Sequence, residues 1–116
     1  MIKTEIYGLA DLGKSFNRLP RAIKDGLVRA VRKSALAVEQ KSKPVTPVDT
    51  GALRRSIRSD IKPLIATISP HTEYAIYVHE GTHRMKARPF MDIGLKGAMS
   101  TIDRVFSEEI DKALKI

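Results

Sequence analysis

The residues most suggestive of catalysis lie in segment 79–83, which reads His-Glu-Gly-Thr-His and matches the pattern H-E-x-x-H. On a helix, histidines four positions apart share one face and bind zinc, with the glutamate as general base of a peptidase. Glycine and threonine are poor residues for a helix interior, so we expect His83 at or beyond a helix end. Basic residues in 84–88 oppose a dication, and a third ligand could come only from a distant part of the chain, with Glu108 or Glu109 as candidates. An HExxH zinc metalloprotease is therefore a remote alternative, and we predict no metal site.

No other catalytic set stands out in the sequence. The chain has no cysteine, which removes thiol catalysis, thiolate metal sites and disulfides. The dinucleotide pattern G-x-G-x-x-G does not occur, and we expect no glycine-rich phosphate-binding loop. We interpret Glu108, Glu109 and Asp111 as part of a solvated helix face. The sequence thus predicts a protein that is not an enzyme and that needs no cofactor.

The net charge of +8 is unevenly distributed along the chain. Residues 1–43 carry ten Lys and Arg against four Asp and Glu, whereas residues 91–116 have a slight acidic excess. A basic face in the first region could meet nucleic acid or an acidic protein, and a solvated helix face is the simpler reading. Few aromatic residues are present, so base stacking has little support. A small basic protein that binds DNA non-specifically, through phosphate contacts alone, is the main alternative function.

A chain of 116 residues fits a single domain, residues 1–116. No apolar run is long enough to span a bilayer. The first ten residues lack the basic start and apolar core of a signal peptide, so synthesis in the cytoplasm is expected.

The elements that would position these residues follow from the apolar spacing. Residues 1–7 alternate as in a short strand, and Asp11 could cap a short helix that runs to about Leu19. From Pro20 the apolar residues recur at helical spacing, which predicts a long helix over 20–42 that Pro44 ends. Its apolar face comprises Ile23, Leu27, Ala30, Val31, Ser34 and Val38.

The second half of the chain contains a predicted hairpin and a predicted last helix. A loop over 44–51 and a helical turn over 52–56 are followed by two strands, 57–62 and 64–69. Residues 74–80 suit either a helical turn or a strand, and the last helix begins at Phe90 or Met91. Its expected face comprises Leu95, Ala98, Met99, Ile102, Val105, Phe106 and Ala113. This order predicts an α+β fold, with long amphipathic helices packed on a small antiparallel sheet.

Two motifs together resemble a known family. The first is Thr-Pro-Val-Asp-Thr-Gly-Ala-Leu-Arg-Arg-Ser-Ile over 46–57, and the second is Tyr-Ala-Ile-Tyr-Val-His-Glu-Gly-Thr over 74–82, followed by Ala-Arg-Pro-Phe-Met over 87–91. They resemble the gene-product-10-like family of tailed phages, whose members are called minor tail, neck or tail-completion proteins. His79 stands where that family more often has glutamate, which puts a role for the glutamate in doubt. The residues that carry the resemblance are Thr46, Pro47, Asp49, Thr50, Gly51, Leu53, Ser56, Tyr74, Tyr77, Val78, Gly81, Thr82, Arg88, Pro89 and Phe90.

The resemblance implies a structural virion protein of a tailed phage or prophage, without catalysis. It would act in head–tail joining or tail completion, as a ring around the DNA path. The resemblance also suggests that this ring has six subunits. Its partners would be other copies of itself, other neck and tail proteins and, non-specifically, DNA in the channel.

Physical roles can be assigned to most motif residues. Asp49 and Thr50 would cap the turn that carries Leu53 inward, and Gly51 would let the chain enter that turn closely. Gly81 would need a positive φ. Two tyrosines and a valine, Tyr74, Tyr77 and Val78, would pack the sheet against the long helix. We interpret residues 82–89 as an exposed loop, and at its end Arg88, Pro89 and Phe90 would restore ordered structure and anchor the last helix.

Overall fold

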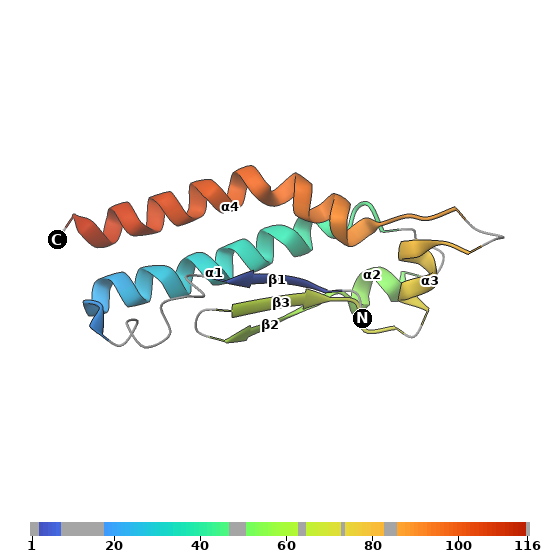
Figure 1. Ribbon diagram of the computed structural model, residues 1–116, viewed down its shortest axis with the longest axis horizontal. Helices are drawn as coiled ribbons and strands as arrows, with labels where there is room; N and C mark the ends of the chain where they lie inside the picture. The colour runs from blue at the N-terminus through green and yellow to red at the C-terminus, as the bar shows by residue number, and fades with distance from the viewer. Residues whose placement is uncertain are drawn as a thin grey trace.

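Two long helices and a small sheet make up most of the computed structural model (Figure 1). It describes residues 3–7, 18–46, 51–62, 65–72, 74–82 and 86–115. Along the chain the elements are β1 Thr4–Tyr7, α1 Arg21–Ser42, α2 Ala52–Ser56, β2 Arg58–Lys62, β3 Ile65–Ser69, α3 Ala75–Glu80 and α4 Phe90–Leu114. The predicted α+β class is confirmed, and so are the long first helix and the hairpin. The short helix expected between Asp11 and Leu19 falls mainly outside the described residues.

Helix α1 is the central layer, because it packs against the sheet and against α4. Its apolar residues repeat at helical spacing, and Val31, Ala35 and Val38 are fully buried. Pro20 precedes the first turn, where its missing N–H costs no hydrogen bond. Figure 1 shows the sheet on one side of α1 and α4 along another side.

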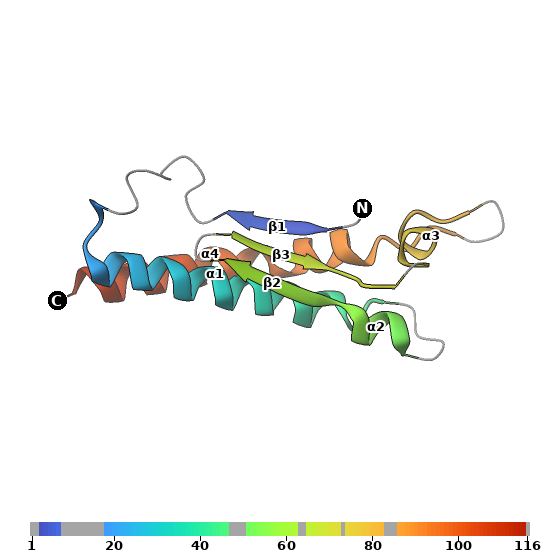
Figure 2. The same ribbon diagram turned by 90° about the horizontal axis from the view of Figure 1, so that it is seen from below.

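The three described strands form an antiparallel sheet in the order β1-β3-β2. Ile6 of β1 pairs with Ala66 of β3, and Thr4 pairs with Ile68, so both pairs face α1. Strand β2 is mostly exposed, and it lies at one edge of the sheet (Figure 2). The sheet therefore contributes one buried face only, and that face completes the core over α1.

Helix α4 runs antiparallel to α1 and contacts it through a narrow stripe that includes small residues. The buried residues along this stripe include Gly94, Ala98, Val105, Glu109 and Ala113. A Cβ added at Gly94 would lie 1.9 Å from the Oγ of Ser42, which shows how closely the two helices approach. The predicted face was partly wrong. Met99 is 56% exposed, because the contact lies about a quarter of a turn away, over the small side chains.

The molecule is long and thin, with principal extents of 56 × 24 × 19 Å. Helices α2 and α3 lie at the same end, near the end of α1 and the start of α4 (Figures 1 and 2). The end of α4 lies at the opposite extremity, beside the start of α1. Among the described helices, none is both long enough and apolar enough to cross a membrane.

Candidate functional site

Arg88 joins the two sequence motifs at one end of the molecule. Its Nε donates a hydrogen bond to the carbonyl oxygen of Val45, 3.1 Å away, just before the first motif. Its backbone N–H donates to the carbonyl oxygen of Val78, 2.9 Å away, inside the second motif. Residues more than 40 positions apart in the chain are thereby held together. This end of the molecule brings the residues of the two motifs together and is the candidate site.

The first motif shapes the connection between α1 and α2. The Oγ1 of Thr46 donates to the carbonyl oxygen of Ser42 at 2.7 Å and so closes the end of α1. Gly51 has a φ of 82°, a left-handed conformation that suits glycine, and it directly precedes α2. Leu53 points inward with 4% exposure, as predicted. The Oγ of Ser56 donates to the carbonyl oxygen of Leu53 at 2.7 Å and stabilises the same short helix.

Pro47, Asp49 and Thr50 lie outside the described residues. The capping role expected for the last two therefore stays a prediction. At the start of α2 the N-cap residue is Gly51, which has no side chain to supply a capping hydrogen bond.

The second motif forms the short helix α3 and the turn after it. Gly81 has a φ of 79°, which confirms the expected positive φ. Val78 is partly buried and packs against the core. Tyr74 and Tyr77 are 44% and 59% exposed, so the expectation that they pack the sheet against the long helix was wrong. Six residues give α3 less than two turns, so it buries one side only, with Ala75, Val78 and His79, and leaves both tyrosine rings in solvent.

Phe90 anchors the start of α4, as expected. Its side chain is fully buried, and its ring meets the ring of His79 edge-on, with centroids 5.3 Å apart. Pro89 occupies the N-cap position of α4. Thr82 lies at the end of the described part of the second motif, directly after Gly81. The motif thus fixes where α4 begins relative to the core.

The geometry of a zinc peptidase is absent where the structure describes the H-E-x-x-H segment. Helix α3 ends at Glu80, so the helical turn that would align the two histidines is not formed. His79 is turned toward Phe90, and its Nε2 lies 3.9 Å from the Oδ1 of Asp92. His83 lies outside the described residues, and within them no group of three or more acidic or histidine side chains could hold a metal ion.

A literal phosphate-loop pattern is present in the sequence, contrary to our expectation. Residues 8–15 read Gly-Leu-Ala-Asp-Leu-Gly-Lys-Ser, which fits G-x-x-x-x-G-K-[ST]. The segment lies outside the described residues. Its surroundings do not suit that function, because the strand before it, β1, pairs antiparallel with β3 at the edge of an antiparallel sheet. Phosphate loops of this kind follow a strand in a βαβ context, so we treat the match as accidental.

Comparison with protein families accounts for the motifs. The sequence model of the family described as "bacteriophage HK97-gp10, putative tail-component" matches residues 10–81, more than half of the chain. The chain belongs to this family. The matched region includes the first motif and the second motif as far as Gly81. Comparisons with curated proteins and with solved structures gave no match.

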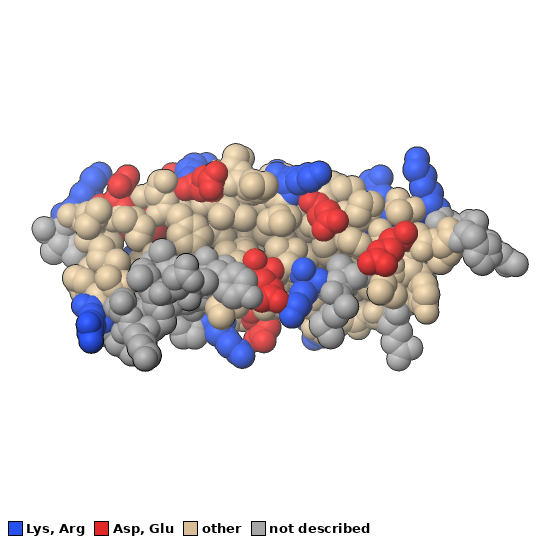
Figure 3. Space-filling view, viewed as in Figure 1, with Lys and Arg blue, Asp and Glu red and all other residues tan. Residues whose placement is uncertain are grey.

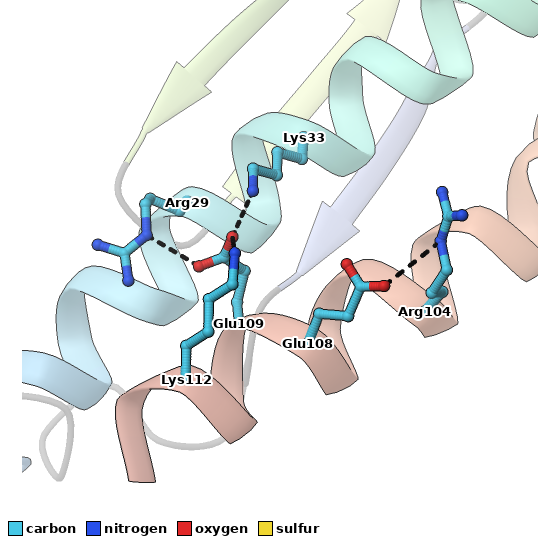
Figure 4. Close-up of polar contacts among 6 residues, drawn as sticks. All are labelled: Arg29, Lys33, Arg104, Glu108, Glu109 and Lys112. Carbon is cyan, nitrogen blue, oxygen red and sulfur yellow. Dashed lines mark hydrogen bonds and ion pairs between the residues drawn. The ribbon is translucent and has the colours of Figure 1, made fainter. Parts of the chain in front are cut away.

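A second polar site of this phage tail-component protein is an ionic cluster around Glu109, which sequence reasoning placed on a solvated face. Only 2% of its side chain is exposed, because α4 turns it toward α1. Its Oε2 accepts from the Nε of Arg29 at 2.9 Å, and its Oε1 accepts from the Nζ of Lys33 (Figure 4). Lys112, one turn further along α4, lies 3.9 Å from the same carboxylate. Arg29 and Lys33 lie 80 and 76 positions away in the chain, so no local pattern reveals these contacts.

Hydrogen bonds from Lys33 and Arg29 lower the pKa of Glu109 to about 2, against a smaller opposing effect of burial. One carboxylate is shared by three cations, so the cluster keeps a net positive charge. The side chains of Arg29, Lys33 and Lys112 stay half-exposed or more. The cluster therefore ties α4 to α1 and also leaves a positive surface beside the contact.

Charges of both signs are interspersed on the face drawn in Figure 3, which includes the outer surface of α4. Helix α1 differs, because it carries six Lys and Arg against two Asp and Glu, whereas α4 carries three against five. The positive excess predicted for the first helical region is therefore concentrated on one element.

Proposed function

We propose that this protein is a structural component of a tailed-phage or prophage virion that acts in head–tail joining or tail completion. It would form a ring around the DNA path, with other copies of itself and other neck and tail proteins as partners. Its place would be the neck or tail of the particle. The observation that carries the proposal is the family match over residues 10–81.

The exposed apolar side chains support an assembling protein. Leu36, Tyr77, Met99 and Leu114 are each more than half exposed, and they are distributed over α1, α3 and α4. A thin molecule with a narrow core leaves such side chains uncovered, and burial between subunits would gain about 25 cal/mol for each square ångström removed from water. The open edge of β2 is a further surface that a neighbouring subunit can cover.

Loss of the gene in a particle-producing host tests the proposal. If the protein joins heads to tails, the mutant should accumulate filled heads and separate tails, which electron microscopy distinguishes. If it completes tails, tails of abnormal length or stability should appear. Supplying the gene in trans should restore infectious particles. Normal yields of infectious tailed particles without the protein would refute the proposed function.

Non-specific DNA binding is a second candidate, favoured by the charge of α1. Its six basic residues against two acidic ones could contact phosphates without reading bases. Such binding is compatible with a ring around DNA, and it would become the primary function only if DNA binding survived in variants that no longer support particle assembly.

A further inference from the structure

We propose that one copy of this protein binds the next through the outer faces of α1 and α4. The first surface, the basic stripe, comprises Arg29, Arg32, Lys33 and Leu36 on α1. The second surface, the acidic row, comprises Met99, Asp103, Ser107 and Asp111 on α4. This inference rests on the proposed function, because it specifies how the subunits of the proposed ring contact each other.

Both surfaces are exposed and each combines charge with an apolar side chain. Helical spacing puts the members of each surface on one face, and every one of them is exposed. Leu36 is 53% exposed and Met99 is 56% exposed, so each surface offers one large apolar side chain. Arg32, Asp103 and Asp111 make no ion pair with any residue in the described ranges. Arg32 on the basic stripe and the two aspartates on the acidic row are therefore opposite charges that remain to be paired.

Contacts within one chain show that the two surfaces lie at the same height along the molecule. Near one end of the helix pair, Gly26 faces Ala113, and Arg29 reaches Glu109. Near the other end, Ser42 faces Gly94. Interpolation between these pairs puts Arg32 and Leu36 beside residues 102–106 of α4. Asp103 and Ser107 lie within one helical turn of that level, about 5 Å.

Equal height is what a closed ring requires. Subunits of a closed ring are related by rotation alone, without translation along the ring axis. If the long helices run roughly along that axis, residues that lie level in one chain meet across the contact between two chains. The basic stripe of one copy would then face the acidic row of its neighbour. The contact is heterologous, so each copy uses both of its surfaces. In a closed ring every basic stripe is therefore paired with the acidic row of a neighbouring copy.

The composition of the basic stripe favours a protein partner over nucleic acid. Leu36 gains nothing from phosphate, but it gains from burial against Met99. Asp25, exposed on the same side of α1 and one turn before Arg29, would repel phosphate. Oppositely charged rows flanking a small apolar contact are typical of interfaces between proteins, where they fix register and suppress wrong pairings.

Cysteine cross-linking tests the contact, because the natural chain has no cysteine and the background is clean. Chains that carry Leu36→Cys are mixed with chains that carry Met99→Cys and treated with a short bis-maleimide. The mixture should give cross-linked dimers, whereas each variant alone should stay uncross-linked. The double variant should give a ladder that ends at the ring size. Ile61→Cys, 39% exposed on the sheet edge, is the matched partner for Leu36→Cys and should give no product.

A charge exchange tests whether the electrostatics select the partner. Arg32→Asp alone and Asp103→Arg alone should each weaken self-association about tenfold or more, because like charges would face each other. The two changes together should restore association to within about threefold of the natural chain. Arg21→Asp, on the same helix but 94% exposed at its start, changes the net charge equally and should have little effect.

The same variants are introduced into gene-deficient particles by supplying the gene in trans, and the purified particles are cross-linked. Cross-linking between positions 36 and 99 with rescue by the charge exchange supports the contact. Restored particles without such cross-links would overturn the contact and leave the proposed function standing. Unchanged particle yield in the gene-deficient host would overturn the proposed function. In that case, cross-linking of the purified protein between positions 36 and 99 would support the contact, and its absence would refute it.

Discussion

Replacing Glu109 by glutamine should destabilise the fold measurably, although both side chains have the same shape. The natural carboxylate accepts hydrogen bonds from Lys33 and Arg29, which lower its pKa from 4.5 to about 2. Each pKa unit corresponds to about 1.4 kcal/mol, so the full difference is about 3 kcal/mol. Since the cations that cover the carboxylate are half-exposed, water screens the pairs, and we expect a loss of about 1–2 kcal/mol.

The lowered pKa of Glu109 also determines how the stability difference between the two chains should change with pH. The pKa of Glu109 is lower in the folded chain than in the unfolded chain, so its contribution is fully present above about pH 4.5. As the pH falls below 4.5 the carboxylate is protonated first in the unfolded chain, and the contribution decreases until the folded chain is protonated as well, below about pH 2. The difference in unfolding free energy between the natural chain and Glu109→Gln should therefore be largest near neutral pH, be small at pH 2 and vanish below it.

Urea unfolding at a series of pH values measures this difference, and thermal unfolding at neutral pH should show a loss of about 4–8 °C. Glu108→Gln is the matched control. Its carboxylate is next in the chain but 58% exposed, and among the described residues it pairs with Arg104 alone, at 3.9 Å. The control should cost no more than about 0.5 kcal/mol. Equal losses in the two variants, or a Glu109→Gln difference that persists undiminished at pH 2, would refute the assignment of the cluster as a stabilising contact.

Three further predictions follow from the geometry. Gly94→Ala should lower the free energy of unfolding by about 3 kcal/mol or more, because its Cβ would lie 2.7 Å from the Cα of Ser42. In Gly97→Ala the Cβ would lie 3.7 Å from the nearest atom of Lys41. This control should leave the free energy of unfolding unchanged or raise it by up to about 1 kcal/mol. Urea unfolding compares the pair, and equal costs would contradict the close approach. The purified protein should hold no stoichiometric zinc and show no peptidase activity. About one zinc per chain after dialysis, lost in His79→Ala, would contradict that expectation. DNA binding should be weak, insensitive to sequence and steeply dependent on salt. A sequence-selective footprint at physiological salt would contradict it.

The elements with regular apolar spacing were predictable because their burial follows from that spacing alone. Val31 and Val38 repeat at helical spacing, and both are fully buried in α1. The hairpin of β2 and β3 was also readable from alternation and from the proline between the strands. In these places local propensity and tertiary packing require the same conformation, so the sequence pattern is sufficient.

The buried stripe of α4 was harder to predict because hydrophobicity indicates the wrong side chains. Met99 is more apolar than Gly94, yet Gly94 is buried and Met99 is exposed. The reason is that α4 lies so close to α1 that only small residues fit between them at Ser42. Such a contact depends on the distance between two elements, and this distance is a property of the tertiary structure. The exposure of Tyr77 has a similar origin, since α3 is too short to bury both of its faces.

The residues of the candidate site also include some whose roles were predictable from the sequence and one whose role was not. The motif residues Gly51, Leu53, Gly81 and Phe90 could be assigned physical roles from their types, because a positive φ or a large apolar side chain has few other uses. Glu109 could not, since its partners come from the other end of the chain. A buried carboxylate is tolerated only when cations accompany it, and α1 supplies them from its basic side.

Arg29 and Lys33 belong to two arrangements at once, and this decides which residues can test the proposed contact between copies. Both cations hold Glu109 inside one chain, and both also belong to the basic stripe that would face the next copy. Reversing either charge would weaken the fold as well as the contact, so loss of assembly in those variants would have two explanations. Arg32 lies beside them on α1 with no ion pair among the described residues, and Asp103 occupies the corresponding position on α4. Changes at these two positions leave the Glu109 cluster intact. Loss of assembly with an unchanged unfolding free energy would therefore report on the contact alone.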